Sequence, residues 1–104
     1  MQESIVDFNS MPWVGPAPGV RFKAVERDGR KLRLVEFTRE FVEEDWCAKG
    51  HTGFVLEGEI EIDFDGTTVN AKAGQGIMIP PGPRSRHKAK VLSGTARLVL
   101  VEDA

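Results

Sequence analysis

The feature that most constrains this chain is a series of short apolar runs, separated by turn residues, that begins at Val20 and continues to the C-terminus. Runs rich in Val, Ile and Phe at this spacing are typical of an all-β sandwich or barrel. Asp28-Gly29 and Asp65-Gly66 lie between neighbouring runs, and a glycine that adopts positive φ there is a strong hairpin signal. We expect strands near residues 20–26, 31–38, 41–47, 53–57, 59–64, 67–72, 76–80, 86–92 and 96–102. Helix should be scarce, because no long segment places apolar residues at helical spacing between two caps.

Alternation along these runs predicts which side chains point inward. In residues 59–64 the apolar side chains share one face and the acidic side chains share the other. The same parity places His87 with Ala89 and Val91, opposite the neighbouring basic residues, so we predict that His87 points inward. Residues 98–101 are apolar on both faces, so we expect the outer face of this strand to be covered by the N-terminal segment or by a second subunit.

The first nineteen residues differ from the rest of the chain. Three prolines and two glycines in residues 10–20 disfavour a regular helix or a central strand. The apolar side chains of this segment would be costly to leave in water. We therefore predict an N-terminal arm over residues 1–19 that packs on the barrel or on a dimer partner, followed by one β-barrel domain over residues 20–104.

Charge and cysteine content exclude several classes of partner. The 104 residues carry 14 Lys and Arg against 16 Asp and Glu, without the positive excess that nucleic-acid binding requires. Uncharged stretches are shorter than the ~20 residues that cross a bilayer, and the N-terminus has no basic region followed by an apolar one. Cys47 is the single cysteine and has no internal disulfide partner, which fits a reducing compartment. We expect a cytoplasmic protein that binds neither nucleic acid nor membrane.

Two segments carry motifs that resemble those of a known family. Residues 50–59 read GHTGFVLEGE, and Gly74 is followed after five residues by Pro80-Pro81-Gly82-Pro83-Arg84. In this order, within residues 46–66 and 74–87, the segments resemble the two signature motifs of the cupin superfamily. The resemblance implies an all-β, RmlC-like jelly-roll barrel, also described as a double-stranded β-helix, that forms homodimers.

The chain departs from the family at the metal ligands. In metal-binding cupins the first motif supplies two histidines and a glutamate, and the second motif supplies a third histidine. None of these four positions holds the family's residue here: they fall at Asp45 and Cys47, or at Glu44 and Trp46 if the gap is one longer, and at His51 and Ser85.

The residues at and beside these positions offer a different donor set. Asp45, Cys47 and His51 carry an oxygen, a sulfur and a nitrogen donor, and His87 lies two residues beyond Ser85, on the same face of a strand. Such a set suits zinc, iron or copper better than magnesium or calcium, because soft and borderline donors outnumber hard oxygen. The ligands bind as thiolate and neutral imidazole, so acid should release the metal.

We expect a pocket at one end of the barrel, lined by Cys47, His51, Phe54, Met78, Ser85 and His87. Arg84 and Arg86 would stand at its mouth and hold an anionic ligand through their forked donors. A purely structural reading also exists, in which Cys47 is a small buried hydrophobe and the histidines and arginines are hydrogen-bonded or solvated polar residues.

The hypothesis for function is binding of a small molecule in this pocket, through a divalent metal held by Cys47, His51, His87 and Asp45. The alternative is a metal-dependent cupin enzyme of the dioxygenase, isomerase or lyase type, acting on a small anionic metabolite. General-base catalysis by one of the histidines without metal, and a binding module without chemistry, are further alternatives. Fold does not choose among them, and no residue pattern identifies the substrate.

Overall fold

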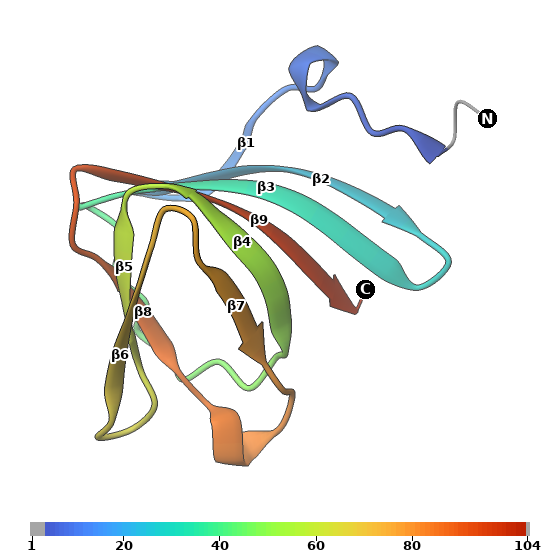
Figure 1. The fold of residues 1–104 in the computed structure, drawn as a ribbon. Coiled ribbons are helices and arrows are strands. Elements are labelled where there is room, and N and C mark those ends of the chain that lie inside the picture. The colour runs from blue at the N-terminus through green and yellow to red at the C-terminus, as the bar shows by residue number, and fades with distance from the viewer. Residues whose placement is uncertain (1–3, 104) are drawn as a thin grey trace.

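A computed structural model describes residues 4–103 as two antiparallel sheets that pack against each other (Figure 1). The larger sheet has six strands in the order β1-β2-β3-β9-β4-β7, and the smaller has three in the order β6-β5-β8. The strands are β1 (Val14–Ala17), β2 (Val20–Arg27), β3 (Arg30–Thr38), β4 (His51–Glu57), β5 (Glu59–Asp63), β6 (Thr68–Lys72), β7 (Gly76–Ile79), β8 (Lys88–Val91) and β9 (Thr95–Asp103). Two short 3-10 helices, η2 (Phe8–Ser10) and η3 (Pro83–Ser85), lie outside the sheets. Residues 4–103 contain no helix that is long and apolar enough to cross a bilayer.

The structure confirms the all-β prediction and places strands at eight of the nine predicted positions. The β2–β3 connection has the expected turn: Asp28 and Gly29 have φ of 52° and 74°, and Arg27 pairs with Arg30. Two successive residues with positive φ match the right-handed twist of the flanking strands, so this dipeptide sets the register of the whole hairpin.

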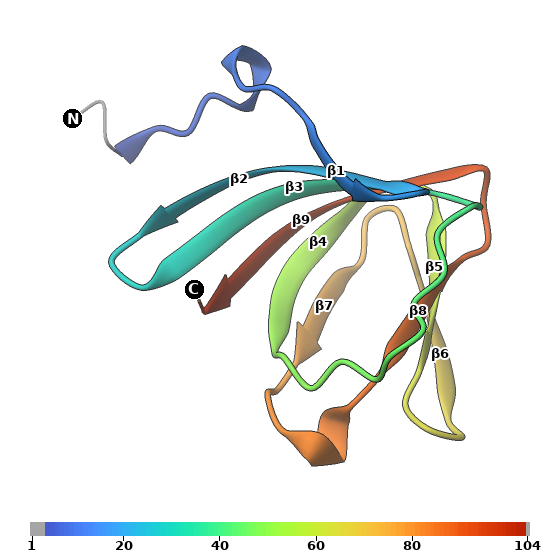
Figure 2. The ribbon, with the colours of Figure 1, turned by 180° about the vertical axis from the view of Figure 1, so that it is seen from behind.

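The predicted strand at residues 41–47 is wrong. This segment is a loop that runs along the smaller sheet beside β8 before it returns to β4 (Figure 2). Its one backbone bridge joins Cys47 to His87. Further back, the Glu43 carboxylate accepts a hydrogen bond from the Ala89 N–H at 2.7 Å, in the place where a backbone carbonyl would stand in a ladder. The Glu43 side chain thus provides the hydrogen-bond acceptor for the backbone N–H of Ala89 at the edge of β8. The loop can therefore pair with β8 here without forming a strand.

The core lies between the two sheets and follows the predicted alternation. Ile60 and Ile62 of β5 are 3% and 4% exposed, and they meet Val35, Val55 and Leu98 of the larger sheet. Their burial confirms which face of residues 59–64 points inward.

The outer face of β9 is covered only in part. Trp13 packs its ring over Arg21 at 4.2 Å and Lys23 at 4.7 Å, so the N-terminal segment lies over β2. On the other side of β9, Phe54 of β4 and Met78 of β7 are 45% and 84% exposed. The division into an arm and a barrel stays a prediction, and the first three residues of that arm lie outside the described residues.

Candidate functional site

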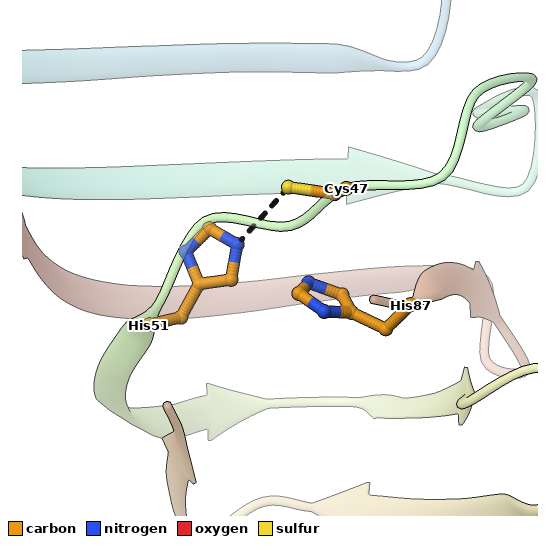
Figure 3. A group of neighbouring side chains, drawn as sticks. All are labelled: Cys47, His51 and His87. Carbon is orange, nitrogen blue, oxygen red and sulfur yellow. Dashed lines mark hydrogen bonds between the residues drawn. The ribbon is translucent and has the colours of Figure 1, made fainter. Parts of the chain in front are cut away.

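Three side chains that the sequence singled out meet inside the molecule. Cys47 stands near the end of the long loop, His51 is the first residue of β4, and His87 precedes β8. One donor atom from each residue lies within 4.8 Å of the other two (Figure 3). The structure therefore contains a Cys/His/His group of the kind that holds a metal ion.

The backbone fixes Cys47 and His87 side by side. Each N–H donates to the carbonyl of the other at 2.9 Å, which forms the isolated bridge between the loop and the start of β8. His87 is 4% exposed, as its inward parity predicts. The bridge thus aligns two donors that are far apart in the sequence.

His51 is positioned by the strand that it opens. Over residues 51–55 of β4 the odd-numbered residues face inward, since Val55 is fully buried while Phe54 is exposed, and His51 shares the parity of Val55. Gly53 lies between them, and a Cβ there would sit 2.1 Å from the Val99 carbonyl oxygen. The glycine lets β4 approach β9 closely and so holds His51 against the cavity.

Contacts around both rings assign their nitrogens. His51 Nε2 faces Cys47 Sγ at 3.7 Å, and the two imidazoles meet edge to face with centroids 5.1 Å apart. His87 Nδ1 lies 3.0 Å from the Ser85 carbonyl oxygen. Because a carbonyl only accepts, Nδ1 of His87 must carry hydrogen, and in the neutral ring the lone pair is then on Nε2.

A buried ion pair completes the site. Glu102 of β9 accepts hydrogen bonds from Arg33 of β3, at 2.6 Å from Nε to Oε1 and 2.9 Å from Nη2 to Oε2, and Oε2 also contacts His51 Nδ1. Burial raises the pKa of Glu102, but the hydrogen bonds and charges of His51 and Arg33 outweigh it and lower the pKa to about 2. Glu102 is therefore a carboxylate at neutral pH.

Sequence reasoning missed Glu102 and Arg33. A signal was present, since Glu102 continues the inward parity of Leu98 and Leu100, and Arg33 shares the parity of Val35. Two opposite charges at inward positions of apolar strands indicate a buried ion pair.

The Cys/His/His group lines a cavity of about 300 Å³ between the sheets. Its apolar walls include Phe37 and Phe41, whose ring centroids are 4.6 Å apart, and isoleucines of the smaller sheet and of β7. Charged side chains also line it: Lys31, Arg33, Glu43, Lys49, Glu102 and Asp103.

Two residues expected in this pocket point the other way. Phe54 and Met78 lie on the outer face of the larger sheet, so the expectation that they line the cavity is wrong. Each neighbours an inward residue, Val55 and Ile77 respectively, and strand alternation sends adjacent side chains to opposite faces.

The other predicted site residues lie around the cavity without lining it. Asp45 is exposed and outside the Cys/His/His group. Ser85 contributes its backbone carbonyl to His87. Arg84 is exposed in η3, and Arg86 pairs with Asp65 and stacks on Trp46 at 5.6 Å. The structure therefore places neither arginine at the mouth of this cavity.

Comparison with known proteins agrees with this architecture. The two facing sheets define a small cupin-fold protein, and the Cys/His/His group between them is of the kind that holds a metal ion. The Cupin domain family matches residues 48–102, and the chain belongs to that family.

Solved structures share the fold across nearly the whole chain. KdgF from Halomonas sp. is 20% identical with a TM-score of 0.75, covering 94% of this chain and 93% of that one. A cupin-2 domain containing protein from Shewanella frigidimarina is 22% identical with a TM-score of 0.68, covering 100% and 99%. At these identities the likeness shows the fold alone.

One curated relative is closer in sequence. Polyketide synthase CurC of Streptomyces cyaneus is 32% identical over 77 residues, which are 72% of this chain and 43% of that protein. The chain thus spans less than half of the length of this relative.

Proposed function

We propose that this chain is a metal-binding cupin that holds one transition-metal ion on Cys47, His51 and His87 and binds a small molecule in the adjoining cavity. The observation that carries the proposal is the convergence of one sulfur and two nitrogen donors within 4.8 Å of one another. All three residues also line the cavity of about 300 Å³, which is of the size that small ligands occupy.

The residues present fit a zinc, iron or copper ion better than magnesium or calcium. Thiolate and imidazole are soft and borderline ligands, whereas the two lighter cations prefer carboxylate, carbonyl and water oxygens. In addition, Nδ1 of each imidazole lies against an oxygen, that of the Glu102 carboxylate for His51 and that of the Ser85 carbonyl for His87. Metal-bound histidines typically have such a partner on the second ring nitrogen.

Three protein ligands leave coordination positions for water or for a bound molecule. A bound transition metal would supply Lewis acidity or an activated water there. The chain's own residues shape the rest of the cavity: its walls are partly apolar, and Lys31 and Lys49 lie on the lining together with Arg33 and three carboxylates. A metal-dependent enzyme of the dioxygenase, isomerase or lyase type acting on a small anionic metabolite would use the same open position.

The name of the relative, polyketide synthase CurC, supports polyketide-like compounds as the ligand class. Polyketides carry carbonyl and enol oxygens on an apolar skeleton, so such a compound would present oxygens to the metal and carbon to Phe37 and Phe41. Acetylacetone, a 1,3-dicarbonyl, is a simple probe. We expect it to raise the Tm of the zinc-loaded protein by mass action. A lower Tm together with loss of zinc from the protein would contradict this ligand class.

Partners and location are proposed on separate grounds. The open apolar face that carries Phe54 and Met78 supports a homodimer in which a second copy covers it. A cytoplasmic, reducing location would keep Cys47 as a thiol available for metal.

Elemental analysis of untagged protein, expressed with zinc and iron supplied, tests the proposed function. We expect close to one equivalent of metal per chain, and a strong loss in Cys47→Ala and in His51→Ala. Asp45→Ala is the matched control, because Asp45 is exposed and outside the group, and it should retain the metal. Metal below about a tenth of an equivalent in the parent protein, or equal metal in all variants, would contradict the proposal.

A further inference from the structure

The two histidines of the group are held in different ways. His87 is fixed locally, by the carbonyl of Ser85 two residues away and by its backbone bridge to Cys47. His51 begins a strand, and Nδ1 of its ring reaches a carboxylate on β9. Nδ1 is buried and has no hydrogen bond of normal geometry among residues 4–103, where its ion-pair contact is the Glu102 carboxylate. This carboxylate is therefore the charged group that faces Nδ1 of the His51 ring.

Glu102 is itself held in place. Its side chain is 6% exposed, and Arg33 binds both carboxylate oxygens through Nε and Nη2. A two-point contact fixes the plane of the carboxylate as well as its position. Arg33 and Glu102 come from neighbouring strands whose register pairs Arg33 with Leu100 and Lys31 with Glu102, so the pair is anchored by the sheet.

We infer that Glu102, locked by Arg33, is a positioning residue for the metal centre: it keeps the proton of His51 on Nδ1 and turns Nε2 toward Cys47. The inference rests on the proposed function, because a positioned Nε2 matters only if a metal binds there. Because Arg33 donates to both of its oxygens, the carboxylate accepts from its neighbours, and this favours the tautomer of His51 in which Nδ1 carries hydrogen. Nε2 then keeps its lone pair on the side of Cys47 Sγ, 3.7 Å away.

The structural alternative is an ion pair that contributes to folding and nothing else. The chain offers a matched control, because Glu36 is also a mostly buried carboxylate, 11% exposed, bound by two arginines. It lies on the opposite face of β3 from the cavity, where Arg21 and Arg97 hold it. Removing either carboxylate breaks its ion pairs with arginine, but of the two carboxylates only Glu102 contacts a histidine of the group.

The first measurement is the affinity for Co²⁺ alone, followed by the absorption of the bound ion. Glu102→Gln leaves one oxygen to serve both Arg33 and His51, and we expect it to weaken Co²⁺ binding about 10- to 100-fold. Glu36→Gln should bind within about threefold of the parent protein, whatever it loses in stability. If Glu102→Gln unfolds, the double change Arg33→Met with Glu102→Leu removes the acceptor without leaving a buried charge unpaired.

The second measurement is nitrogen NMR of the isotopically labelled, metal-free protein. The chain contains two histidines, so His51→Ala assigns the signals of both. We expect His51 to carry hydrogen on Nδ1 in the parent and in Glu36→Gln, and to become a mixture of tautomers in the double variant. A fold-only role for Glu102 would leave the tautomer unchanged.

The outcomes separate the two proposals. Parent-like Co²⁺ affinity and an unchanged His51 tautomer in folded Glu102 variants, with binding lost in Cys47→Ala, would overturn the positioning role and leave the metal centre standing. Absence of Co²⁺ binding in the parent protein, with His51 still protonated on Nδ1, would overturn the proposed function although Glu102 orients the ring.

Discussion

Cys47, His51 and His87 reach one cavity through two different local features of the backbone. A backbone bridge aligns Cys47 with His87, and strand parity aims His51 inward. These residues could be proposed from the sequence because they are the only cysteine and histidines and lie in or beside the two motifs. Glu102 could not be linked to them, because its partner Arg33 is 69 residues away and the contact depends on the register of two strands.

Gly53 carries a prediction at the scale of one residue. A methyl group at this position would lie 2.1 Å from the Val99 carbonyl oxygen, so β4 must move away from β9 in Gly53→Ala. We expect a loss of about 1–3 kcal/mol in the free energy of unfolding, measured by urea denaturation, together with weaker metal binding. Gly94→Ala is the control, since no atom lies within 4 Å of its Cβ position. Equal stability of both variants would refute the role given to Gly53.

Strands with regular alternation were predicted well, whereas the segment at 41–47 was not. Alternation is a property of neighbouring residues and is therefore visible in the sequence. The loop instead depends on Glu43 reaching the backbone of Ala89 across 46 positions, a contact that no local pattern encodes. The lining of the cavity could not be predicted for the same reason, because its walls come from both sheets and depend on contacts between distant residues.

Ion pairing across β2, β3 and β9 makes stability depend on pH. Arg21 first, and then Arg97, lower the pKa of Glu36 through hydrogen bonds. A carboxyl whose pKa is lower in the folded state stabilises the fold above its unfolded pKa, and this contribution is lost as the pH falls through the folded value. Glu36→Gln should therefore cost about 1 kcal/mol at pH 7 and progressively less below the ordinary pKa of 4.5.

Urea denaturation of the parent protein, Glu36→Gln and Glu26→Gln at several pH values checks this dependence. Glu26 is exposed and forms no ion pair among residues 4–103, so its variant should follow the parent. A difference between the parent and Glu36→Gln that stays constant from pH 7 to strongly acidic pH would contradict the ion-pair account.

At the scale of the whole molecule, the N-terminal segment contacts the outer face of the larger sheet at Lys23, and toward β4 and β7 this face exposes Phe54 and Met78. Register aligns its side chains in two rows across β2, β3, β9, β4 and β7: Val25, Leu32, Val101, Thr52 and Met78 in one, and Lys23, Leu34, Val99, Phe54 and Gly76 in the other. A two-fold axis would place the same patch of a second copy against this face.

We predict a dimer through this face. Met78→Lys combined with Phe54→Glu should shift light-scattering mass toward the monomer and weaken association at least about tenfold. Val69→Lys is the control, because Val69 is 47% exposed on the smaller sheet, away from the patch. A parent protein that is monomeric at all concentrations, or a double variant that dimerises as the parent does, would contradict this assembly.

X-ray absorption at the edge of the metal that copurifies with the protein tests the central claim most directly. We predict a first shell with one sulfur at about 2.3 Å and two imidazole nitrogens at about 2.0–2.1 Å if the ion is zinc. The remaining ligands would be light atoms from water or a bound molecule. A shell of nitrogen and oxygen without sulfur would contradict the assignment of Cys47, and with it the Cys/His/His centre.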